Sequence, residues 1–299
     1  MSALTAIYRL NKKPVGIEEM QTMLDCLQHR GTDDHGLHVE RHVGLGHRMR
    51  RVTPESVYEK LPAKSRESSL VITCDARVDN RDDLIEHLFP SHRRVAEITD
   101  SEIILRAYEK WGEDCAAKLL GDFVFVIWDA KKQKLFCARD SMGVKHFYYY
   151  YKPNVLFAIA SEIKALLCLP DIPKRLNETY IGDILILNYQ DKEATPFEGI
   201  KRLPANSALR MDENGLKIWQ YWHPSSKSRN RYRTSGDYEE EFRERFAEAV
   251  NCRLRSINPA GSLLSGGLDS SSISCVASHH LEEAGKPPLE TFSAIFPSI

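Results

Sequence analysis

Several features that mark common protein classes are missing from this sequence. The 299 residues carry 41 basic and 42 acidic side chains without a block of like charge, so we expect neither a nucleic-acid partner nor a membrane partner. The apolar N-terminal piece ends at Arg9 and is too short for a signal peptide or a spanning helix. The seven cysteines form no C-x-x-C pair, so we expect no zinc site. They indicate reduced, mostly buried thiols of a cytoplasmic protein.

The length allows two domains with separate cores. The residue composition changes near Trp222. Residues 224–235 are polar, basic and without periodicity, which is typical of an exposed linker. We therefore predict a first domain at 1–222, a linker at 223–236 and the beginning of a second domain at 237–299. The linker arginines are expected to be solvated rather than to bind phosphate; they are Arg229, Arg231 and Arg233.

The first domain mixes strands with a few helices. Apolar residues at helical spacing predict helices at 17–27, with Gly31 as its stop signal, and at 102–111. Apolar, β-rich runs predict strands at 69–74, 123–128, 135–138, 147–151 and 155–160. This mixture indicates an α+β layered domain. After the linker, an apolar residue at every fourth position of 238–254 predicts an amphipathic helix with Asp237 as its N-cap.

A glycine-serine segment near the C-terminus, 265–271, is the most informative motif. An apolar run precedes it and a helix-forming run follows, so we expect a strand, a tight turn and a helix. Gly266 and Gly267 allow the backbone to approach a ligand closely, and the free N–H groups of the next helix favour an anion. The segment lacks the lysine of the Walker loop, which favours a departing pyrophosphate over a transferred γ-phosphate. Without its strand and helix, the same pair of glycines would indicate only a hairpin or loop.

The motif resembles the PP-loop of ATP pyrophosphatases, which activate a carbonyl as an adenylate. Upstream blocks resemble those of class II glutamine amidotransferases; they lie at 29–36, 121–129, 138–145, 160–166 and 197–204. In this order, the blocks make the chain similar to the N-terminal half of an asparagine synthetase family member, from Met1 to Ile299. The resemblance implies an α+β N-terminal-nucleophile fold, a four-layer αββα sandwich. It also implies the start of an α/β PP-loop domain that uses ATP and Mg²⁺.

In that family an N-terminal cysteine, exposed by loss of Met1, attacks the side-chain amide of glutamine. Ser2 stands at this position, and a hydroxyl is a poorer nucleophile than a thiol, although its amine can still act as base. Asp75 and Ala76 lie at the oxyanion-hole positions, and Asp75 replaces the asparagine that donates to the oxyanion. A carboxylate offers no donor, and the loss of one donor costs about 3–4 kcal/mol.

The residues expected around the glutamine substrate are also changed. Arg77 replaces an acid, and Met49 falls on the arginine that binds the substrate carboxylate, although Arg48 or Arg50 could reach in if the register slips. Asp100, which would hold the glutamine amine, is kept. We expect a degenerate glutaminase, similar to β-lactam synthetases and lasso peptide macrolactam synthetases, which need no ammonia. A live enzyme that uses Ser2 and a repurposed binding pocket are the alternatives.

For the second domain the resemblance implies an ATP site with a magnesium ion held by Asp269. The implied ATP-binding residues are Leu263, Ser265, Gly266, Gly267, Leu268, Asp269, Ser270, Ser271 and Ala294. Leu263 and Ala294 could equally be ordinary sheet core. The rest of the family's synthetase domain is not in this sequence, so we expect a fragment without synthetase activity of its own.

The leading hypothesis is the front half of an AMP-forming amide ligase that adenylates a carboxylate. A working glutamine-hydrolysing asparagine synthetase and a non-catalytic nucleotide-binding remnant are the alternatives. The acceptor is left open among aspartate, a β-amino acid and a precursor peptide. Glutamine as a ligand and a homodimer are also left open.

Overall fold

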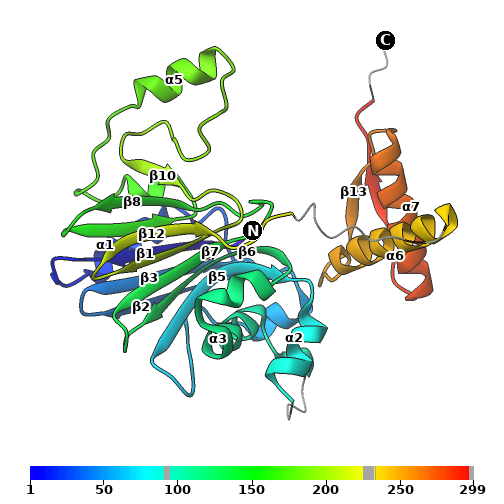
Figure 1. Cartoon of the computed structure of the whole chain (residues 1–299), viewed down its shortest axis with the longest axis horizontal. Coiled ribbons are helices and arrows are strands. Elements are labelled where there is room, and N and C mark those ends of the chain that lie inside the picture. The colour runs from blue at the N-terminus through cyan, green and yellow to red at the C-terminus, as the bar shows by residue number, and fades with distance from the viewer. Residues whose placement is uncertain (91–94, 225–231, 233, 296–299) are drawn as a thin grey trace. The chain divides into compact units, whose positions relative to one another are not determined.

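The computed structural model describes residues 1–90, 95–224, 232 and 234–295 and divides into two compact units (Figure 1). The first unit is Met1–Arg51 with Glu55–His223, and the second is Val52–Pro54 with Pro224–Ile299. Most of the predicted linker, with Arg229, Arg231 and Arg233, lies outside the described residues.

The first unit is built on two six-stranded sheets, each antiparallel between neighbours. One sheet has the order β10-β8-β9-β1-β3-β2 and the other the order β12-β11-β7-β6-β5-β4. The strands of the first sheet are β1 (Ala3–Tyr8), β2 (Asp34–Glu40), β3 (Val43–Met49), β8 (Tyr148–Lys152), β9 (Leu156–Ala160) and β10 (Ile200–Arg202). Those of the second are β4 (Ala63–Lys64), β5 (Leu70–Val78), β6 (Gly121–Asp129), β7 (Lys134–Arg139), β11 (Ser207–Asp212) and β12 (Gly215–Gln220).

Helices cover the outer faces of both sheets. On the first sheet lie α1 (Ile17–Asp25) and α4 (Ile163–Leu166), and on the second lie α2 (Arg81–Leu88) and α3 (Asp100–Trp111). Apolar side chains fill three successive cores: between α1 and its sheet, between the two sheets, and between the second sheet and α3. The unit is therefore a four-layer αββα sandwich, as the resemblance implied.

Strand β1 explains how the start of the chain is fixed. Leu4 and Tyr8 enter the core between the sheets, whereas Ala3 and Ile7 face the helix layer. The strand is paired on both sides, with β3 and with β9. Because side chains alternate between the two faces, a strand buried on both must be apolar throughout. Ser2 is thereby held at the end of a central strand.

The predicted elements of the first unit all form, with shifted ends. The first helix ends at Asp25, so the prediction that Gly31 stops it is wrong. Instead, Gly31 allows two backbone segments to lie close together, because a Cβ there would lie 2.4 Å from the carbonyl carbon of Arg48. The prediction of mostly buried cysteines is also wrong, because three of the seven free thiols are buried: Cys74, Cys115 and Cys137.

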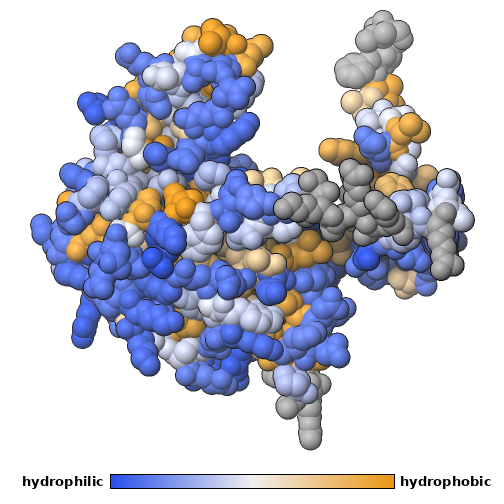
Figure 2. Space-filling view, in the orientation of Figure 1, coloured by the Kyte–Doolittle hydropathy of each residue, from blue (hydrophilic) through white to orange (hydrophobic). Residues whose placement is uncertain are grey.

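An excursion between β9 and β10 carries α5 (Glu178–Leu185) away from the sheets (Figure 1). Its apolar side chains are exposed, and they form the orange cap at the upper end of Figure 2. The most exposed apolar side chains of this excursion lie at the end of α5 and just after it: Leu185, Ile186 and Leu187. Nothing in the described chain packs over this segment, so it does not contribute to the core.

The second unit contains α6 (Ser235–Arg253), β13 (Gly261–Leu263), α7 (Leu268–Glu283) and β14 (Glu290–Phe292). Thr234 caps α6, so the prediction of Asp237 as N-cap is wrong: Asp237 is the third residue of the helix and completes a capping box with Thr234. Strands β13 and β14 pair in parallel, and α7 connects them, as expected for the start of an α/β domain. None of the helices in the described ranges is long and apolar enough to span a membrane.

Candidate functional site

Ser2 lies directly before β1, beside the chain that follows β3. Its side chain is buried, and its Oγ accepts a hydrogen bond of 2.9 Å from the Arg50 backbone N–H. The same hydroxyl can donate to the Arg50 carbonyl at 3.4 Å, and the Met49 sulfur lies 3.9 Å away. The hydroxyl is thus positioned by the backbone just after β3.

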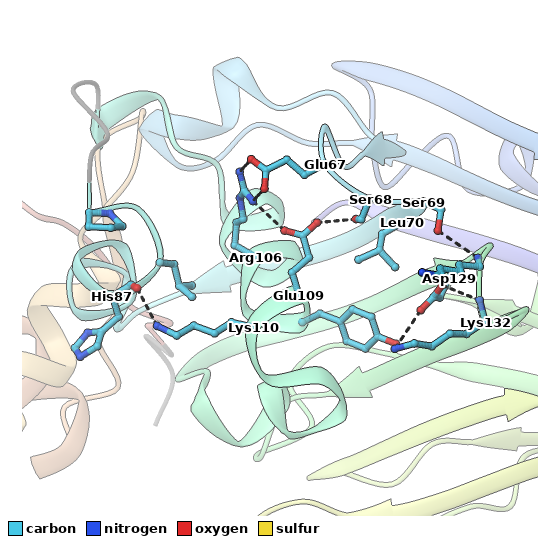
Figure 3. Close-up of a pocket in the computed structure, with 14 residues that line it drawn as sticks. Glu67, Ser68, Ser69, Leu70, His87, Arg106, Glu109, Lys110, Asp129 and Lys132 are labelled. Carbon is cyan, nitrogen blue, oxygen red and sulfur yellow. Dashed lines mark hydrogen bonds and ion pairs between the residues drawn. The ribbon is translucent and has the colours of Figure 1, made fainter.

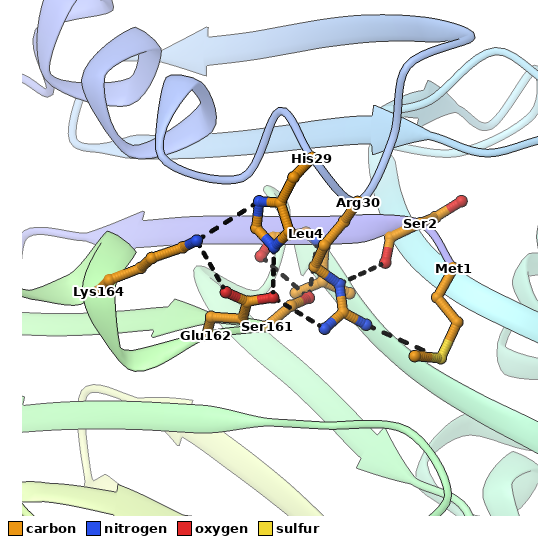
Figure 4. Close-up of polar contacts among 8 residues, drawn as sticks. All are labelled: Met1, Ser2, Leu4, His29, Arg30, Ser161, Glu162 and Lys164. Carbon is orange, nitrogen blue, oxygen red and sulfur yellow. Dashed lines mark hydrogen bonds and ion pairs between the residues drawn. The ribbon is translucent and has the colours of Figure 1, made fainter.

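A cluster of charged side chains holds the backbone beside Ser2 (Figure 4). Arg30 donates from Nε to the Ser2 carbonyl at 3.3 Å and from Nη1 to Glu162 at 3.1 Å. His29 and Lys164 reach the same carboxylate, at 3.0 and 3.2 Å. Burial opposes ionisation of Glu162, but hydrogen bonds from these three side chains lower its pKa below the usual range. The N-terminus is therefore anchored to the segment before α4.

Asp75, which the sequence predicted at the oxyanion-hole position, forms an ion pair with Lys145. The Lys145 Nζ lies 2.8 Å from Asp75 Oδ1; Asp75 is buried, and the Lys145 side chain is 12% exposed. The same two charges act on the N-terminus: burial lowers the pKa of the Met1 amine, Asp75 raises it and Lys145 lowers it. Asp75 and Lys145 are therefore close to the start of the chain. A carboxylate paired in this way accepts hydrogen bonds and donates none.

Residues 48–50 are the candidates for binding a substrate carboxylate. Met49 is buried beside Ser2 and carries no charge. Arg48 points to α1, where it donates to the Leu24 carbonyl and pairs with Asp25 at 2.7 Å, so it does not reach the Ser2 region through a slipped register. The Arg50 guanidinium is half exposed and donates to Thr32 at 3.1 Å.

Asp100, the expected contact for a substrate amine, is engaged by the protein itself. Arg81 donates to Oδ1 at 2.6 Å, and the Val78 N–H donates to Oδ2 at 3.2 Å. Burial raises the pKa of Asp100 to about 7; the Arg81 charge acts against this shift, and the Glu59 charge adds to it. A ligand ammonium would have to compete with Arg81 for this carboxylate.

The two other altered positions lie on the same strand, β5. Ala76 pairs with Phe123 of β6 and offers only its backbone. Arg77 is half buried, and its Nε lies 3.2 Å from Asp79 Oδ1. The positive charge of Arg77 is therefore balanced by Asp79, two residues further along the chain.

In the second unit the glycine-serine segment forms the predicted turn between β13 and α7. Gly266 has a φ of +83°, which favours glycine, and a Cβ there would meet open space. The Ser265 and Ser270 hydroxyl oxygens lie 2.9 Å apart. Gly267 is the N-cap of α7 without a side-chain cap, so this helix N-terminus can accept an anion.

The other predicted nucleotide-site residues lie around this turn. Leu268, Asp269, Ser270 and Ser271 form the first turn of α7. Leu263 is 81% exposed and Ala294 is exposed too, so their interpretation as sheet core is wrong for the described structure. Backbone hydrogen bonds join the two strands here, from Leu264 N–H to the Phe292 carbonyl at 2.9 Å.

Mg²⁺ can be tested against these residues by its ligand chemistry. Within the described ranges no three His, Cys, Asp or Glu side chains are grouped to hold a metal ion. Asp269 is a single exposed carboxylate on the first turn of α7. Mg²⁺ commonly binds one or two carboxylates together with substrate phosphates, so Asp269 fits a metal that arrives with a nucleotide.

Two family models match the chain. The model described as glutamine amidotransferase domain matches residues 1–222, and the one described as asparagine synthase matches residues 241–298. The chain belongs to the asparagine synthetase family. It is 36% identical to asparagine synthetase [glutamine-hydrolyzing] 3 of Bacillus subtilis, over 93% of this chain and 45% of that protein. It is 29% identical to amidase chry2 of Gibberella zeae, over 92% of this chain and 41% of that protein.

Among solved structures, the fold resembles the glutamine phosphoribosylpyrophosphate amidotransferase of B. subtilis, with a TM-score of 0.53. The identity is 14%, over 97% of this chain and 65% of that one, so this likeness shows the fold alone. The chain spans about half the length of the curated relatives it matches.

A cavity of about 690 Å³ lies away from these positions, between α3, α2 and the turn after β6 (Figure 3). Its charged side chains already pair with one another: Arg106 binds Glu67 at 2.5–2.7 Å and Glu109 at 3.1 Å. Glu109 also accepts from Ser68 at 2.7 Å. Because these side chains bind one another, we interpret them as a structural network rather than as a ligand-binding site.

Two residues of the candidate site were not expected from the sequence. Lys145 ends the 138–145 block that carried part of the resemblance, so its place in the block was a usable signal. Arg81, which binds Asp100, lies six residues from Asp75 on the first turn of α2. Pairing between distant charges depends on how β5, α2 and α3 pack, so sequence spacing gives no sign of it.

The ion pair of Asp75 with Lys145 predicts coupled stability. Asp75→Ala leaves the largely buried Lys145 ammonium uncompensated, and we expect a loss of about 3–5 kcal/mol in the free energy of unfolding. The double variant Asp75→Ala with Lys145→Ala should lose less than the sum of the two single losses. Urea unfolding of the four proteins measures the coupling, and simple additivity would contradict the pair.

Asp100 predicts a pH dependence of stability. Its folded pKa of about 7 lies above the ordinary value of 3.8, so between these values the folded state binds more protons than the unfolded state. The contribution of Asp100 is therefore fully present below about pH 4 and is lost as the pH rises to about 7. Urea unfolding from pH 4 to 8 should show a flatter profile for Asp100→Asn than for the wild type. Parallel profiles would contradict the raised pKa.

Proposed function

We propose that this chain is the front part of an ATP-dependent, AMP-forming amide ligase whose glutaminase half does not hydrolyse glutamine. The family membership supports the ligase class. The ion pair of Asp75 with Lys145 is the observation that supports the absence of glutamine hydrolysis. The free thiols of all seven cysteines fit a reducing compartment, so we place the protein in the cytoplasm.

Glutamine hydrolysis at Ser2 would require a donor for the oxyanion that develops on the amide oxygen. The family resemblance places an asparagine at this position, whereas this chain has Asp75 bonded to Lys145. The loss of one such donor slows the chemical step by about 10²–10³-fold, and a negative charge at the same place adds to the cost. The hydroxyl of Ser2 further lowers the intrinsic reactivity relative to a thiol.

The substrate contacts support the same proposal. Met49 offers no charge for a substrate carboxylate, and Asp100 is already bonded to Arg81 and the Val78 N–H. A glutamine ligand would therefore lack a positive charge for its carboxylate, and the carboxylate that would bind its amine is already bonded to the protein. We therefore propose that the amine that completes the amide bond comes from the substrate, as in ligases that need no ammonia. The acceptor is a small-molecule or peptide carboxylate.

For the ligase half, we propose that the turn before α7 binds the β,γ-pyrophosphate of ATP. Ser265, Gly266 and Gly267 form the turn, and Ser270 and Ser271 present hydroxyls from the first helical turn. Asp269 would hold a Mg²⁺ ion, which neutralises phosphate charge as pyrophosphate leaves. The uncapped N-terminus of α7 supplies backbone donors of the kind that bind phosphate.

A working glutaminase that uses Ser2 is the second candidate. The Bacillus relative at 36% identity is named a glutamine-hydrolyzing asparagine synthetase. The Ser2 hydroxyl is also held in a defined position by Arg50. In this candidate, the Ser2 amine would accept the hydroxyl proton after Met1 is removed.

Glutamate release from glutamine separates the two candidates. We expect the wild type to release no more glutamate than Ser2→Ala, because the oxyanion position lacks a donor. The assay is carried out on protein whose intact mass shows that Met1 is gone, so that a blocked amine does not explain a negative result. Glutamate production by the wild type that Ser2→Ala abolishes would refute the proposal.

Calorimetry of the 1–299 chain with ATP and Mg²⁺ tests the nucleotide site. We expect binding, and at least a tenfold weaker affinity for Asp269→Asn, because the metal loses its carboxylate. His279→Ala, exposed on the last turns of α7, is the matched control and should bind like the wild type. Absence of heat at high protein concentration would favour a remnant without nucleotide binding.

A further inference from the structure

Two cysteines that are far apart in the sequence meet on the helix-covered face of the first sheet. Cys26 is the C-cap of α1, and Cys168 follows the end of α4. Their sulfur atoms lie 2.8 Å apart across a separation of 142 residues, so one thiol donates a hydrogen bond to the other. Both residues are partly exposed, which gives a small oxidant access to them.

The surroundings of the pair differ from those of the strand cysteines. Cys74 and Cys137 are buried in strands β5 and β7, and burial raises the pKa of each thiol well above its ordinary value. Such thiols are inert because the thiolate is the reactive form. Cys26 and Cys168 lie at helix ends on the outer layer instead.

The two thiols have different tasks in an oxidation. Burial, and then the hydrogen bond to Cys26, raise the pKa of Cys168 to about 11, while Lys174 lowers it. Cys168 therefore keeps its proton, which its sulfur can donate to the Cys26 sulfur or to the Lys164 carbonyl at 3.3 Å. A protonated thiol suits the resolving step, which leaves the first attack on the oxidant to Cys26.

We propose that Cys26 and Cys168 are a modification site that forms a reversible disulfide with hydrogen peroxide. The Cys26 thiolate attacks one peroxide oxygen, the O–O bond breaks and hydroxide leaves, which gives a sulfenic acid at Cys26. The Cys168 sulfur then attacks the Cys26 sulfur, loses its proton and expels the hydroxyl as water. Overall, two thiols and one hydrogen peroxide give one disulfide and two waters. The sulfurs need to approach by less than about 1 Å to reach the bond length.

The bond would connect two segments that also hold the N-terminus. The chain from Cys26 to Arg30 leads to the guanidinium that binds the Ser2 carbonyl, and Glu162 lies just before α4 on the other segment (Figure 4). The ion pair of Arg30 with Glu162 and the disulfide would thus join the same two segments at separate points. This modification does not depend on whether the glutaminase is active.

Peptide mass mapping of the 1–299 chain tests the site. After treatment with hydrogen peroxide and alkylation, we expect the peptides of Cys26 and Cys168 to be joined, with a loss of two hydrogens and no alkyl group on either. Dithiothreitol should restore two alkylatable thiols. Cys26→Ser and Cys168→Ser should each abolish the joined peptide, and Cys275→Ser, which changes an exposed cysteine on α7, should retain it.

Two results would overturn the proposal. One is a sulfinic or sulfonic acid at Cys26 while Cys168 remains alkylatable, which would show that Cys168 does not resolve the intermediate. The other is an unmodified pair at a peroxide concentration that oxidises the exposed Cys275. Either serine variant alone leaves the hydrophobic layer nearly unchanged in volume. Its unfolding midpoint in the reduced state, measured beside the wild type, shows that a lost crosslink is not a lost fold.

Discussion

The burial of β1 on both faces is the constraint on which the first unit depends. Its side chains alternate between the core of the two sheets and the core under α1, and strands pair with it on both edges. A strand held on four sides cannot shift without exposing apolar surface, which costs about 25 cal/mol per Å². Ser2, directly before this strand, is therefore held in a fixed position, whatever its own reactivity.

Charge pairing within the protein distinguishes the region around Ser2. Lys145 binds Asp75, Arg81 binds Asp100, and Arg30 with Glu162 binds the chain beside Ser2. Removing one member of a buried pair is costly, because the other charge is left in a medium of low polarity. The same pairs that stabilise the fold thus occupy the groups that a charged substrate would need. This competition is the physical basis of the proposed loss of glutamine hydrolysis.

The sequence predicted the regular elements of the fold well where apolar residues repeat. The runs that became β5 to β9 are continuous or alternating apolar segments, and the helical spacing gave α1, α3 and α6. The prediction for Gly31 as a helix stop was wrong because a distant segment decides this position: the backbone of Arg48 leaves no room for a Cβ there. The error at the start of α6 was local. Thr234 and Asp237 are both good N-caps and belong to one capping box, in which Thr234 is the cap.

By itself, the sequence determined the regular elements, the α+β class and the turn before α7, because periodicity and motifs are local properties of the chain. The family and its αββα layers followed from the resemblance that the order of the motifs carries. It also showed that Asp75 stands where a donor is expected. Only the tertiary structure decided what Asp75, Asp100 and Arg48 bind, since their partners come from other strands and helices. The meeting of Cys26 with Cys168 was decided in the same way, because two helix ends 142 residues apart become neighbours only when α1 and α4 pack on one sheet.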